Sequence, residues 1–293
     1  MDNRPRYLFP DGAQFGHDNL VLHARARQHS ISAFAGPLSI KTVVNGVVSW
    51  RVAGRDLAVD QGSFLVLNAG EEYSMDVNAP RPVETACIFF RSGFVEAHAL
   101  DATTSVEASL DDPQRAAPAL PFLSRLHRDP DGRTMRRVQS VAARCERELR
   151  PSSFEEDFLI LSDELLRLYA EVRAQMARLP ALKARTREEV FRRLQRGREY
   201  LHSSMEESVS LESTARVACL SRYHFHRAFV QAFRKTPHVY LTEVRLARAH
   251  GLLQSGFGVL EACAEVGFSS ASSFTRLFKG VYGVPPSAIR KRT

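Results

Sequence analysis

The sequence predicts an α+β protein, with an antiparallel β-barrel in its N-terminal part, helices after the barrel and an all-α domain at its C-terminal end. Two observations predict this fold class. Between residues 34 and 90, short runs rich in Val, Phe and Ile alternate with turn residues. From about residue 132 onwards, apolar residues recur at helical spacing instead. A chain of 293 residues has room for about two domains, and we divide it into 1–112, 113–180 and 181–293.

The N-terminal strands are expected in three stretches of sequence, KTVVNGVVSWRVAG, DLAVDQGSFLVLNAGEEYSMDV and VETACIFF. Within the first of them, Asn45-Gly46 predicts a tight hairpin, because both residues tolerate the positive φ angles that such a turn needs. Further turns are expected at Ala53-Gly54, Gln61-Gly62 and Ala69-Gly70. Short strands interrupted this often favour an antiparallel barrel or sandwich.

Two helices are predicted in the middle of the chain, at residues 135–150 and 154–179. The second has an apolar seam, interrupted by Gln175, whose members are Phe158, Leu161, Leu165, Leu168, Val172 and Leu179. We expect this seam to join two subunits; the alternative is that it packs on its own domain. Pro180 ends the helix, and the polar stretch ALKARTREE is expected to connect it to the last domain.

The composition is that of a folded globular protein, with 44% hydrophobic and 25% charged residues. No apolar run reaches the roughly 20 residues that cross a bilayer, and MDNRPRYLFPDG at the start lacks the apolar part of a secretion signal. We therefore expect a cytoplasmic protein. Four dispersed cysteines without zinc spacing are expected to be buried thiols; they are Cys87, Cys145, Cys219 and Cys263.

The positive charge is concentrated in the last part of the chain. The whole sequence has a net charge of +7, but residues 181–293 contain 19 Lys and Arg against 9 Asp and Glu, a net of +10. Residues 1–180 contain the other 21 Lys and Arg against 24 Asp and Glu, a net of −3. This asymmetry favours a polyanionic partner for the C-terminal domain, although a solvated basic face would have the same composition.

An internal repeat lies in this basic region. Phe225-His226-Arg227-Ala228-Phe229 recurs 49 residues later as Phe274-Thr275-Arg276-Leu277-Phe278. Two Phe residues four positions apart share one face of a helix, so each pair is expected to anchor its helix while the Arg between them projects outward.

Each copy is preceded by a short helix and a tight turn that contains a serine. Ser221 and either Ser269 or Ser270 are suitable N-caps for the helices that contain the Phe pairs. Helix, turn and capped helix form the helix-turn-helix arrangement, whose second helix enters the major groove of DNA. The helix predicted between the motifs, Pro237–Gln254, is about 27 Å long at 1.5 Å per residue. Successive major grooves are about 34 Å apart, so one subunit could reach two of them.

Residues 188–292 resemble the DNA-binding domain of the AraC/XylS-type bacterial transcription regulators. The resemblance covers nearly the whole of that domain, in the stretches SLESTARVACLSRYHFHRAF, TPHVYLTEVRLARAHGLL, VLEACAEVGFSSASSFTRLFK and YGVPPSAIRKR. It implies two helix-turn-helix subdomains joined by a linker helix. Two positions depart from the family: Arg234 stands where Gly is usual at the end of the first recognition helix, and Ile289 where an aromatic residue is usual.

The resemblance also implies which side chains read DNA. The base-facing positions of the first motif correspond to Tyr223, His226 and Arg227, with Arg222 beside them, whereas His224 falls on another face and is expected to be structural. In the second motif they correspond to Ala271, Ser272, Thr275 and Arg276, next to the cap Ser270. Arginine can bind guanine through two hydrogen bonds, but alanine and serine discriminate little, so the second motif is expected to be the less exacting reader.

The strand-rich region resembles a cupin-type barrel, the sensing domain common among these regulators. Cupin enzymes hold a metal through histidines, but this chain has no His between His29 and His98. In the stretch Gly62–Tyr73, which resembles the second cupin motif, Tyr73 takes the histidine position and Asn68 that of the usual proline. We therefore expect no metal, no other cofactor and no catalytic residue. Trp50 and Tyr73 could line a pocket for a small organic effector or be plain core residues, so no effector-binding residue is named.

These observations favour a sequence-specific transcription regulator of the bacterial cytoplasm, on the nucleoid when bound to DNA. The expected partners are double-stranded DNA at an operator or promoter, a small effector and a second copy of the chain, and an activator would also contact RNA polymerase. The sequence does not distinguish activation from repression. Two alternatives stay open: a metal-independent cupin-like enzyme with an accessory DNA-binding tail, and a regulator whose barrel only dimerises.

Overall fold

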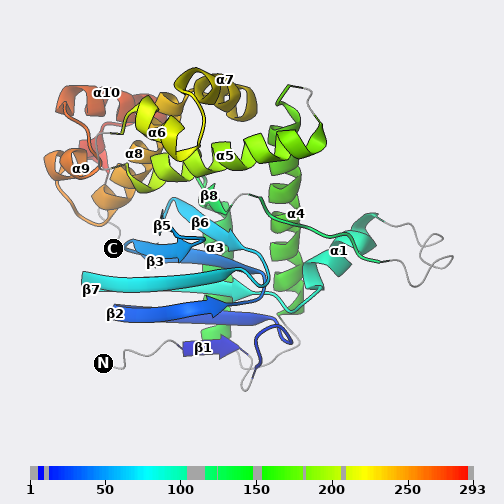
Figure 1. The fold of residues 1–293 in the computed structure, drawn as a ribbon. Helices are drawn as coiled ribbons and strands as arrows, with labels where there is room; N and C mark the ends of the chain where they lie inside the picture. The colour runs from blue at the N-terminus through cyan, green and yellow to red at the C-terminus, as the bar shows by residue number, and fades with distance from the viewer. Residues whose placement is uncertain are drawn as a thin grey trace. The chain divides into compact units, whose positions relative to one another are not determined.

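The fold is taken from a computed structural model that describes residues 6–9, 13–103, 116–123, 125–147, 154–180, 183–205 and 209–289 (Figure 1). The chain divides into two compact units, Met1–Arg173 and Ala174–Thr293. The first contains the strands and the second only helices in its described part. In the described residues, no helix combines the length and the apolar character that crossing a membrane requires.

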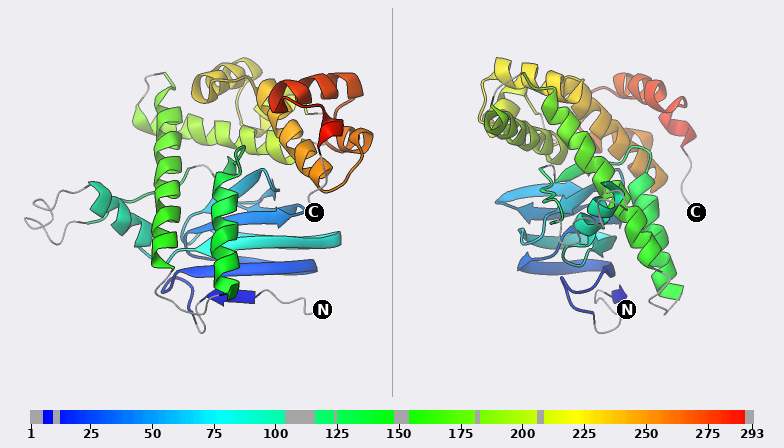
Figure 2. Two further views of the ribbon diagram at one scale, coloured as in Figure 1. Left: turned by 180° about the vertical axis from the view of Figure 1, so that it is seen from behind. Right: turned by 90° about the vertical axis from the view of Figure 1, so that its right-hand side faces the viewer.

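The strands of the first unit form a nearly closed antiparallel barrel, which confirms the predicted fold class (Figures 1 and 2). The strand order is β1-β2-β7-β3-β6-β8, and β4 pairs with both β5 and β7. The strands are β1 (Arg6–Phe9), β2 (Leu20–Ala35), β3 (Ser39–Asn45), β4 (Val48–Val52), β5 (Arg55–Val59), β6 (Ser63–Leu67), β7 (Glu72–Phe89) and β8 (Leu126–Arg128).

The hairpin predicted at Asn45-Gly46 is wrong. The strands on either side of it, β3 and β4, do not pair with each other; both pair with β7, one after the other along its length. Gly46 bends the chain at φ +92°, and a Cβ atom there would lie 2.9 Å from Cγ2 of Val83. The hairpin in this region is instead β4–β5, whose turn residues Ala53 and Gly54 both have positive φ. Asn45-Gly46 therefore bends the chain between β3 and β4 without reversing its direction, so that both strands remain paired with β7.

The first unit also contains α1 (Phe94–Thr103), which precedes β8, and α3 (Arg133–Arg147) and most of α4 (Glu155–Ala177), which follow it. Figure 2 shows α3 lying across the sheet in its left-hand view. One hydrophobic core joins Ile40, Phe64 and Ile88 of the sheet to Val138 of α3 and Phe158 of α4.

The apolar seam of α4 is buried in its own chain, so the prediction that it joins two subunits is wrong. Phe158, Leu161, Leu165 and Leu168 belong to the core shared with the barrel, and Val172 and Leu179 are also buried. The heptad-like spacing thus reflects packing within the subunit. Three of the cysteines are buried thiols as predicted, namely Cys87, Cys145 and Cys263, but Cys219 is exposed.

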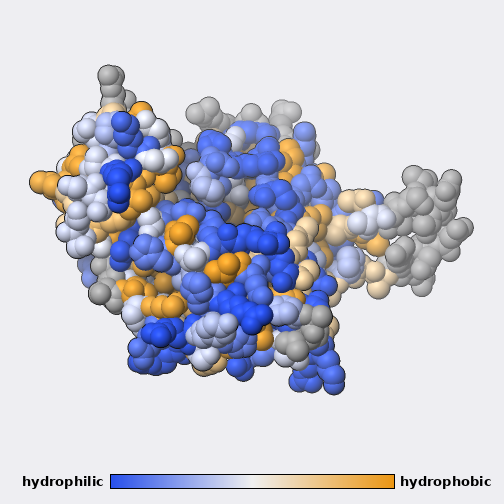
Figure 3. Space-filling view, turned by 90° about the horizontal axis from the view of Figure 1, so that it is seen from above, coloured by the Kyte–Doolittle hydropathy of each residue, from blue (hydrophilic) through white to orange (hydrophobic). Residues whose placement is uncertain are grey.

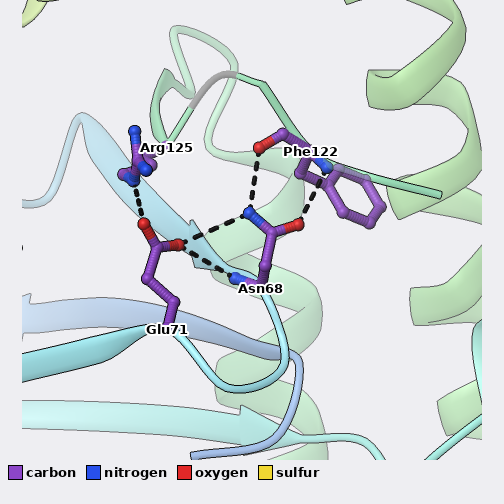
Figure 4. Close-up of polar contacts among 4 residues, drawn as sticks. All are labelled: Asn68, Glu71, Phe122 and Arg125. Carbon is purple, nitrogen blue, oxygen red and sulfur yellow. Dashed lines mark hydrogen bonds and ion pairs between the residues drawn. The ribbon is translucent and has the colours of Figure 1, made fainter. Parts of the chain in front are cut away.

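The stretch that resembles the second cupin motif fixes the chain at the edge of the barrel (Figure 4). The side-chain amide of Asn68 donates to the Phe122 carbonyl at 3.0 Å, and the Phe122 N–H donates to the Asn68 Oδ1 atom at 2.8 Å. Glu71 accepts from the Asn68 backbone N–H at 3.2 Å and pairs with Arg125. These bonds hold the segment before β8, so Asn68 and Glu71 position the backbone here.

The second unit is made of helices in its described part, as predicted, and the helix predicted at Pro237–Gln254 has those bounds. The helices are α5 (Ala184–Ser203), α6 (Leu211–Val217), α7 (Arg222–Phe233), α8 (Pro237–Gln254), α9 (Val259–Glu265), α10 (Ala271–Tyr282) and the short η2 (Pro286–Ala288). The main difference is at the start of α5, which begins within the stretch ALKARTREE that was expected to be a connection. Arg and Glu are good helix formers, so that polar stretch continues as helix.

Candidate nucleic-acid interface

The two F-x-R-x-F repeats occupy equivalent places in the second unit, on α7 and on α10. Phe225, Phe229, Phe274 and Phe278 have no exposed surface, whereas Arg227 and Arg276 are exposed. This confirms that each Phe pair anchors its helix while the Arg between them points to solvent. The anchoring is aromatic in both motifs: the Phe229 ring centroid lies 4.6 Å from that of Phe233, and the Phe278 centroid lies 4.6 Å from that of Tyr282.

Serine caps begin both of these helices. Ser221 accepts a hydrogen bond from the His224 N–H at 3.3 Å, and Ser270 accepts one from the Ser273 N–H at 3.3 Å. Ser270, rather than Ser269, is therefore the second cap. The Ser270 hydroxyl oxygen already accepts this hydrogen bond. A phosphate at this position would therefore interact mainly with the backbone N–H groups at the start of α10.

The residues predicted to read DNA all have solvent-accessible surface. On α7, Arg222, Tyr223, His226 and Arg227 are exposed, with Tyr223 at 76%. At the start of α10 and along it, Ser270, Ser272 and Arg276 are exposed, while Ala271 and Thr275 are half-buried. His224, which was predicted to be structural, is exposed as well.

The arginines of this surface carry charge that the protein does not neutralise. Within the described part of the chain, Arg222, Arg227 and Arg276 form no ion pair with a carboxylate. Other arginines of the same unit do, for example Arg192 with Glu188 and Arg193 with Glu189. Unpaired arginines on an exposed helix face are available to an anionic partner.

The second motif has a more apolar surface than the first. In Figure 3, orange hydrophobic atoms gather at the left of the view, where Figure 1 places α9 and α10. The exposed apolar residues of this region are Leu260, Leu277, Val281 and Val284. The residues predicted to read DNA include two arginines on α7, Arg222 and Arg227, and one on α10, Arg276; the expectation that the second motif discriminates less between bases stays a prediction.

Between the motifs runs α8, and it has the predicted bounds of Pro237 and Gln254. Thr236 caps it by accepting from the Val239 N–H at 3.2 Å, and Pro237 stands in its first turn, where a missing N–H costs nothing. With 18 residues it is about 27 Å long. Both α9 and α10 pack against it.

Arg234 ends α7 in the left-handed conformation, with φ 59° and ψ 20°. The resemblance to the AraC/XylS-type regulators implies Gly at this position. A residue with a side chain pays about 1 to 2 kcal/mol for this conformation, which glycine adopts freely.

We therefore expect Arg234→Gly to raise the free energy of unfolding of the second unit by about 1 kcal/mol. Lys235→Gly is the matched control, because Lys235 has no positive φ and pairs with Glu243 at 2.7 Å. Chemical denaturation followed by circular dichroism measures both. Equal destabilisation by the two substitutions would show that the left-handed cap costs nothing.

A second candidate site is a cavity of about 330 Å³ inside the barrel of the first unit. Trp50 and Tyr73, the two residues considered as pocket residues, are buried and both line it. The lining also includes a residue that sequence reasoning missed, Lys41, which is 1% exposed. The sequence did contain a sign that Lys41 is unusual, because it lies within the largely apolar strand SIKTVVN, and buried charged side chains are rare. Among the described residues, no group of three or more His, Cys, Asp or Glu is placed to hold a metal.

Comparison with known proteins agrees with this geometry. A family model described as a helix-turn-helix domain matches residues 214–292. An HTH-type transcriptional regulator of Haemophilus influenzae is 42% identical over 82 residues, 28% of each chain. The regulator YbfI of Bacillus subtilis is 24% identical over 220 residues, which are 74% of this chain and 71% of that one. The crystal structure of an AraC-type regulator from Chromobacterium violaceum has 27% identity and a TM-score of 0.31, and covers 32% of this chain and 86% of its own.

Residues 214–292 of the second unit therefore match a helix-turn-helix domain. The predicted resemblance to the AraC/XylS-type transcription regulators is confirmed for this part of the chain. The chain spans 28% of the length of the Haemophilus influenzae relative and 31% of the length of a further relative, the regulator YbfP of Bacillus subtilis.

Proposed function

We propose that the protein is a sequence-specific transcription regulator that binds double-stranded DNA through α7 and α10. The observation that carries this proposal is the pair of serine-capped helices, each anchored by two buried Phe residues and each presenting an exposed, unpaired Arg. The net charge of +10 on residues 181–293 supplies the attraction to phosphate that such binding requires.

The length of α8 supports binding of both motifs to one duplex. At about 27 Å it is a little shorter than the roughly 34 Å between successive major grooves on one face of DNA. Side chains on α7 and α10 extend the reach beyond the ends of the linker helix. One subunit then reads two neighbouring segments, with Arg222, Tyr223, His226 and Arg227 in one groove and Ala271, Ser272, Thr275 and Arg276 in the next.

Substitution of the two arginines tests this arrangement. We expect Arg227→Ala and Arg276→Ala each to weaken binding to a promoter fragment by about 5- to 150-fold, which corresponds to about 1 to 3 kcal/mol. The loss on scrambled DNA should be smaller if each Arg reads a base. Fluorescence anisotropy at fixed salt measures both affinities.

Arg51→Ala is the control, because it removes the same charge from an exposed position of the first unit. An equal loss on specific and scrambled DNA would assign the tested Arg to a phosphate. Unchanged affinity in both variants, or binding that does not weaken with salt, would contradict the proposal.

We propose further that the N-terminal part controls DNA binding, with 1–112 as a cupin-like sensor domain, 113–180 as a helical linker or dimerisation region and 181–293 as the DNA-binding domain. Control can come from a small effector or from dimerisation, and light scattering at the concentration of the DNA-binding assay separates these routes. Because the seam of α4 is buried in one chain, dimerisation would use another surface. A promoter–reporter assay gives the direction of regulation, and activation would imply contact with RNA polymerase.

A further inference from the structure

The barrel cavity has an apolar wall and a single buried cation. Its volume is about 330 Å³, and it is lined by residues of β2, β3, β4 and β7 and by Phe15, which precedes β2. Aromatic rings make up much of the wall: Phe15, Phe34, Trp50, Tyr73 and Phe89. Phe34 meets Tyr73 edge to face with centroids 5.8 Å apart, and Phe15 meets Phe89 at 4.9 Å.

Lys41 reaches into this cavity from β3. Its Nζ atom donates to the Tyr73 hydroxyl at 3.0 Å and lies 3.5 Å from the centroid of the Phe89 ring. In the described part of the chain it pairs with no carboxylate. A fully buried ammonium group ordinarily has an anionic partner, because taking a charge out of water is costly. Lys41 therefore lacks the anionic partner that would offset the cost of burying its charge.

The other titratable groups that face the cavity do not replace that partner. They are Cys87 and Tyr73 of β7 and His29 of β2. Burial raises the pKa of the Cys87 thiol, which keeps it in the neutral form at neutral pH. Burial also lowers the pKa of Lys41 to about 7, and the nearby Cys87 opposes this shift only in part. An anion that entered the cavity would restore the charged form of the lysine.

We infer that the barrel binds a small monocarboxylic acid with an apolar body, whose carboxylate pairs with Lys41 and whose body packs against the aromatic wall. This inference specifies the chemical class of the proposed effector. It rests on the proposed function only in that binding of the acid would control DNA binding. One cation matches one negative charge, whereas a phosphate dianion would need more. A sugar would need many more hydrogen-bonding partners than this wall provides.

The cavity volume sets the size of the ligand. Water occupies about 30 Å³ per molecule in the liquid, so 330 Å³ corresponds to roughly eleven waters and to a ligand of about ten non-hydrogen atoms. Hydrocinnamate and isocaproate have suitable sizes and bodies, one aromatic and one aliphatic. Hydrocinnamide, which has the same shape as hydrocinnamate without its charge, is the matched ligand control.

Calorimetric titration of the full-length protein with these three compounds tests the inference. We expect at least one acid to bind, and hydrocinnamide to bind at least tenfold more weakly than hydrocinnamate. The acid should bind the ammonium form of Lys41, which is present below about pH 7. Affinity should therefore fall about tenfold between pH 6 and pH 8, with uptake of a proton on binding near neutral pH.

The variant Lys41→Met separates recognition from folding. Replacing an unpaired buried charge by an apolar side chain of similar length is expected to keep or raise the melting temperature, while acid binding falls at least tenfold. Lys279→Met is the control, because it removes an exposed lysine of α10 and should leave acid binding unchanged.

Three results would overturn the inference: no binding of either acid at millimolar concentration, equal binding of acid and amide, or unchanged acid binding in Lys41→Met. Each is measured without DNA. If the unsubstituted protein binds the promoter but neither acid, only this inference is rejected; if the arginine substitutions leave DNA binding unchanged, only the proposed function is rejected.

Discussion

Phe229→Ala is expected to lower the free energy of unfolding of the second unit by about 3 to 5 kcal/mol. The Phe229 side chain has no exposed surface, and its ring contacts those of Phe225, Phe233 and Tyr240 with centroids 5.4, 4.6 and 5.9 Å apart. Truncation removes these contacts and leaves a cavity where α7 meets α8. Since a small helical domain is stabilised by only about 5 to 15 kcal/mol, this loss would leave it barely folded.

Tyr223→Ala is the matched control on the same helix. Tyr223 is 76% exposed, so its removal should change stability by less than about 0.5 kcal/mol while weakening DNA binding. The sequence contains one tryptophan, Trp50, which lies in the first unit. Tryptophan fluorescence therefore reports unfolding of the barrel, and circular dichroism reports the loss of helix. A Phe229→Ala protein with an unchanged helix transition would show that the aromatic cluster does not hold α7.

The same substitution, glycine to alanine, is expected to have opposite effects at two helical positions. At Gly197 in α5, an added Cβ atom would lie 2.5 Å from Cε2 of Phe225, and the Phe225 ring is fully buried. At Gly280 in α10, an added Cβ atom would meet nothing within 4 Å. Alanine favours a helix by about 1 kcal/mol over glycine, but overpacking of a rigid core costs about 1 to 3 kcal/mol or more.

We therefore expect Gly280→Ala to stabilise the second unit by about 1 kcal/mol and Gly197→Ala to destabilise it by about 2 kcal/mol. Chemical denaturation of the two variants side by side measures this difference of about 3 kcal/mol. Gly197→Ala should also weaken DNA binding, because relief of the clash moves Phe225 and with it α7. If Gly197→Ala were as stabilising as Gly280→Ala, this result would contradict the close contact between Gly197 of α5 and Phe225 of α7.

The helical unit could be predicted closely because its signals are local. Ser221 and Ser270 mark two helix starts, and Pro237 marks a third. The spacing of the Phe pairs fixes which face is buried. The nine residues named as DNA-reading rest on the family resemblance; their exposure is consistent with that role, which stays a prediction until binding is measured.

The barrel could be predicted only in outline, because its pairing depends on contacts between distant residues. A local turn signal at Asn45-Gly46 does not reveal that β3 and β4 share β7 as a partner. The burial of Lys41 depends on rings from β7, far away in sequence. Likewise, apolar spacing in α4 is the same whether the seam meets a second subunit or the barrel of its own chain.

The role of β7 as the common partner of β2, β3 and β4 has a consequence for how the chain folds as it is made. Leu20 pairs with Phe89, 69 positions later, so the barrel cannot close until the ribosome has released the end of β7. The helices of the second unit contact mainly the next helix in sequence, although α5 also contacts α7 and α8, and topologies rich in local contacts fold faster than sheets built from distant strands. The barrel is therefore the slower unit to assemble, and its unpaired strands are the part of the nascent chain most exposed to aggregation.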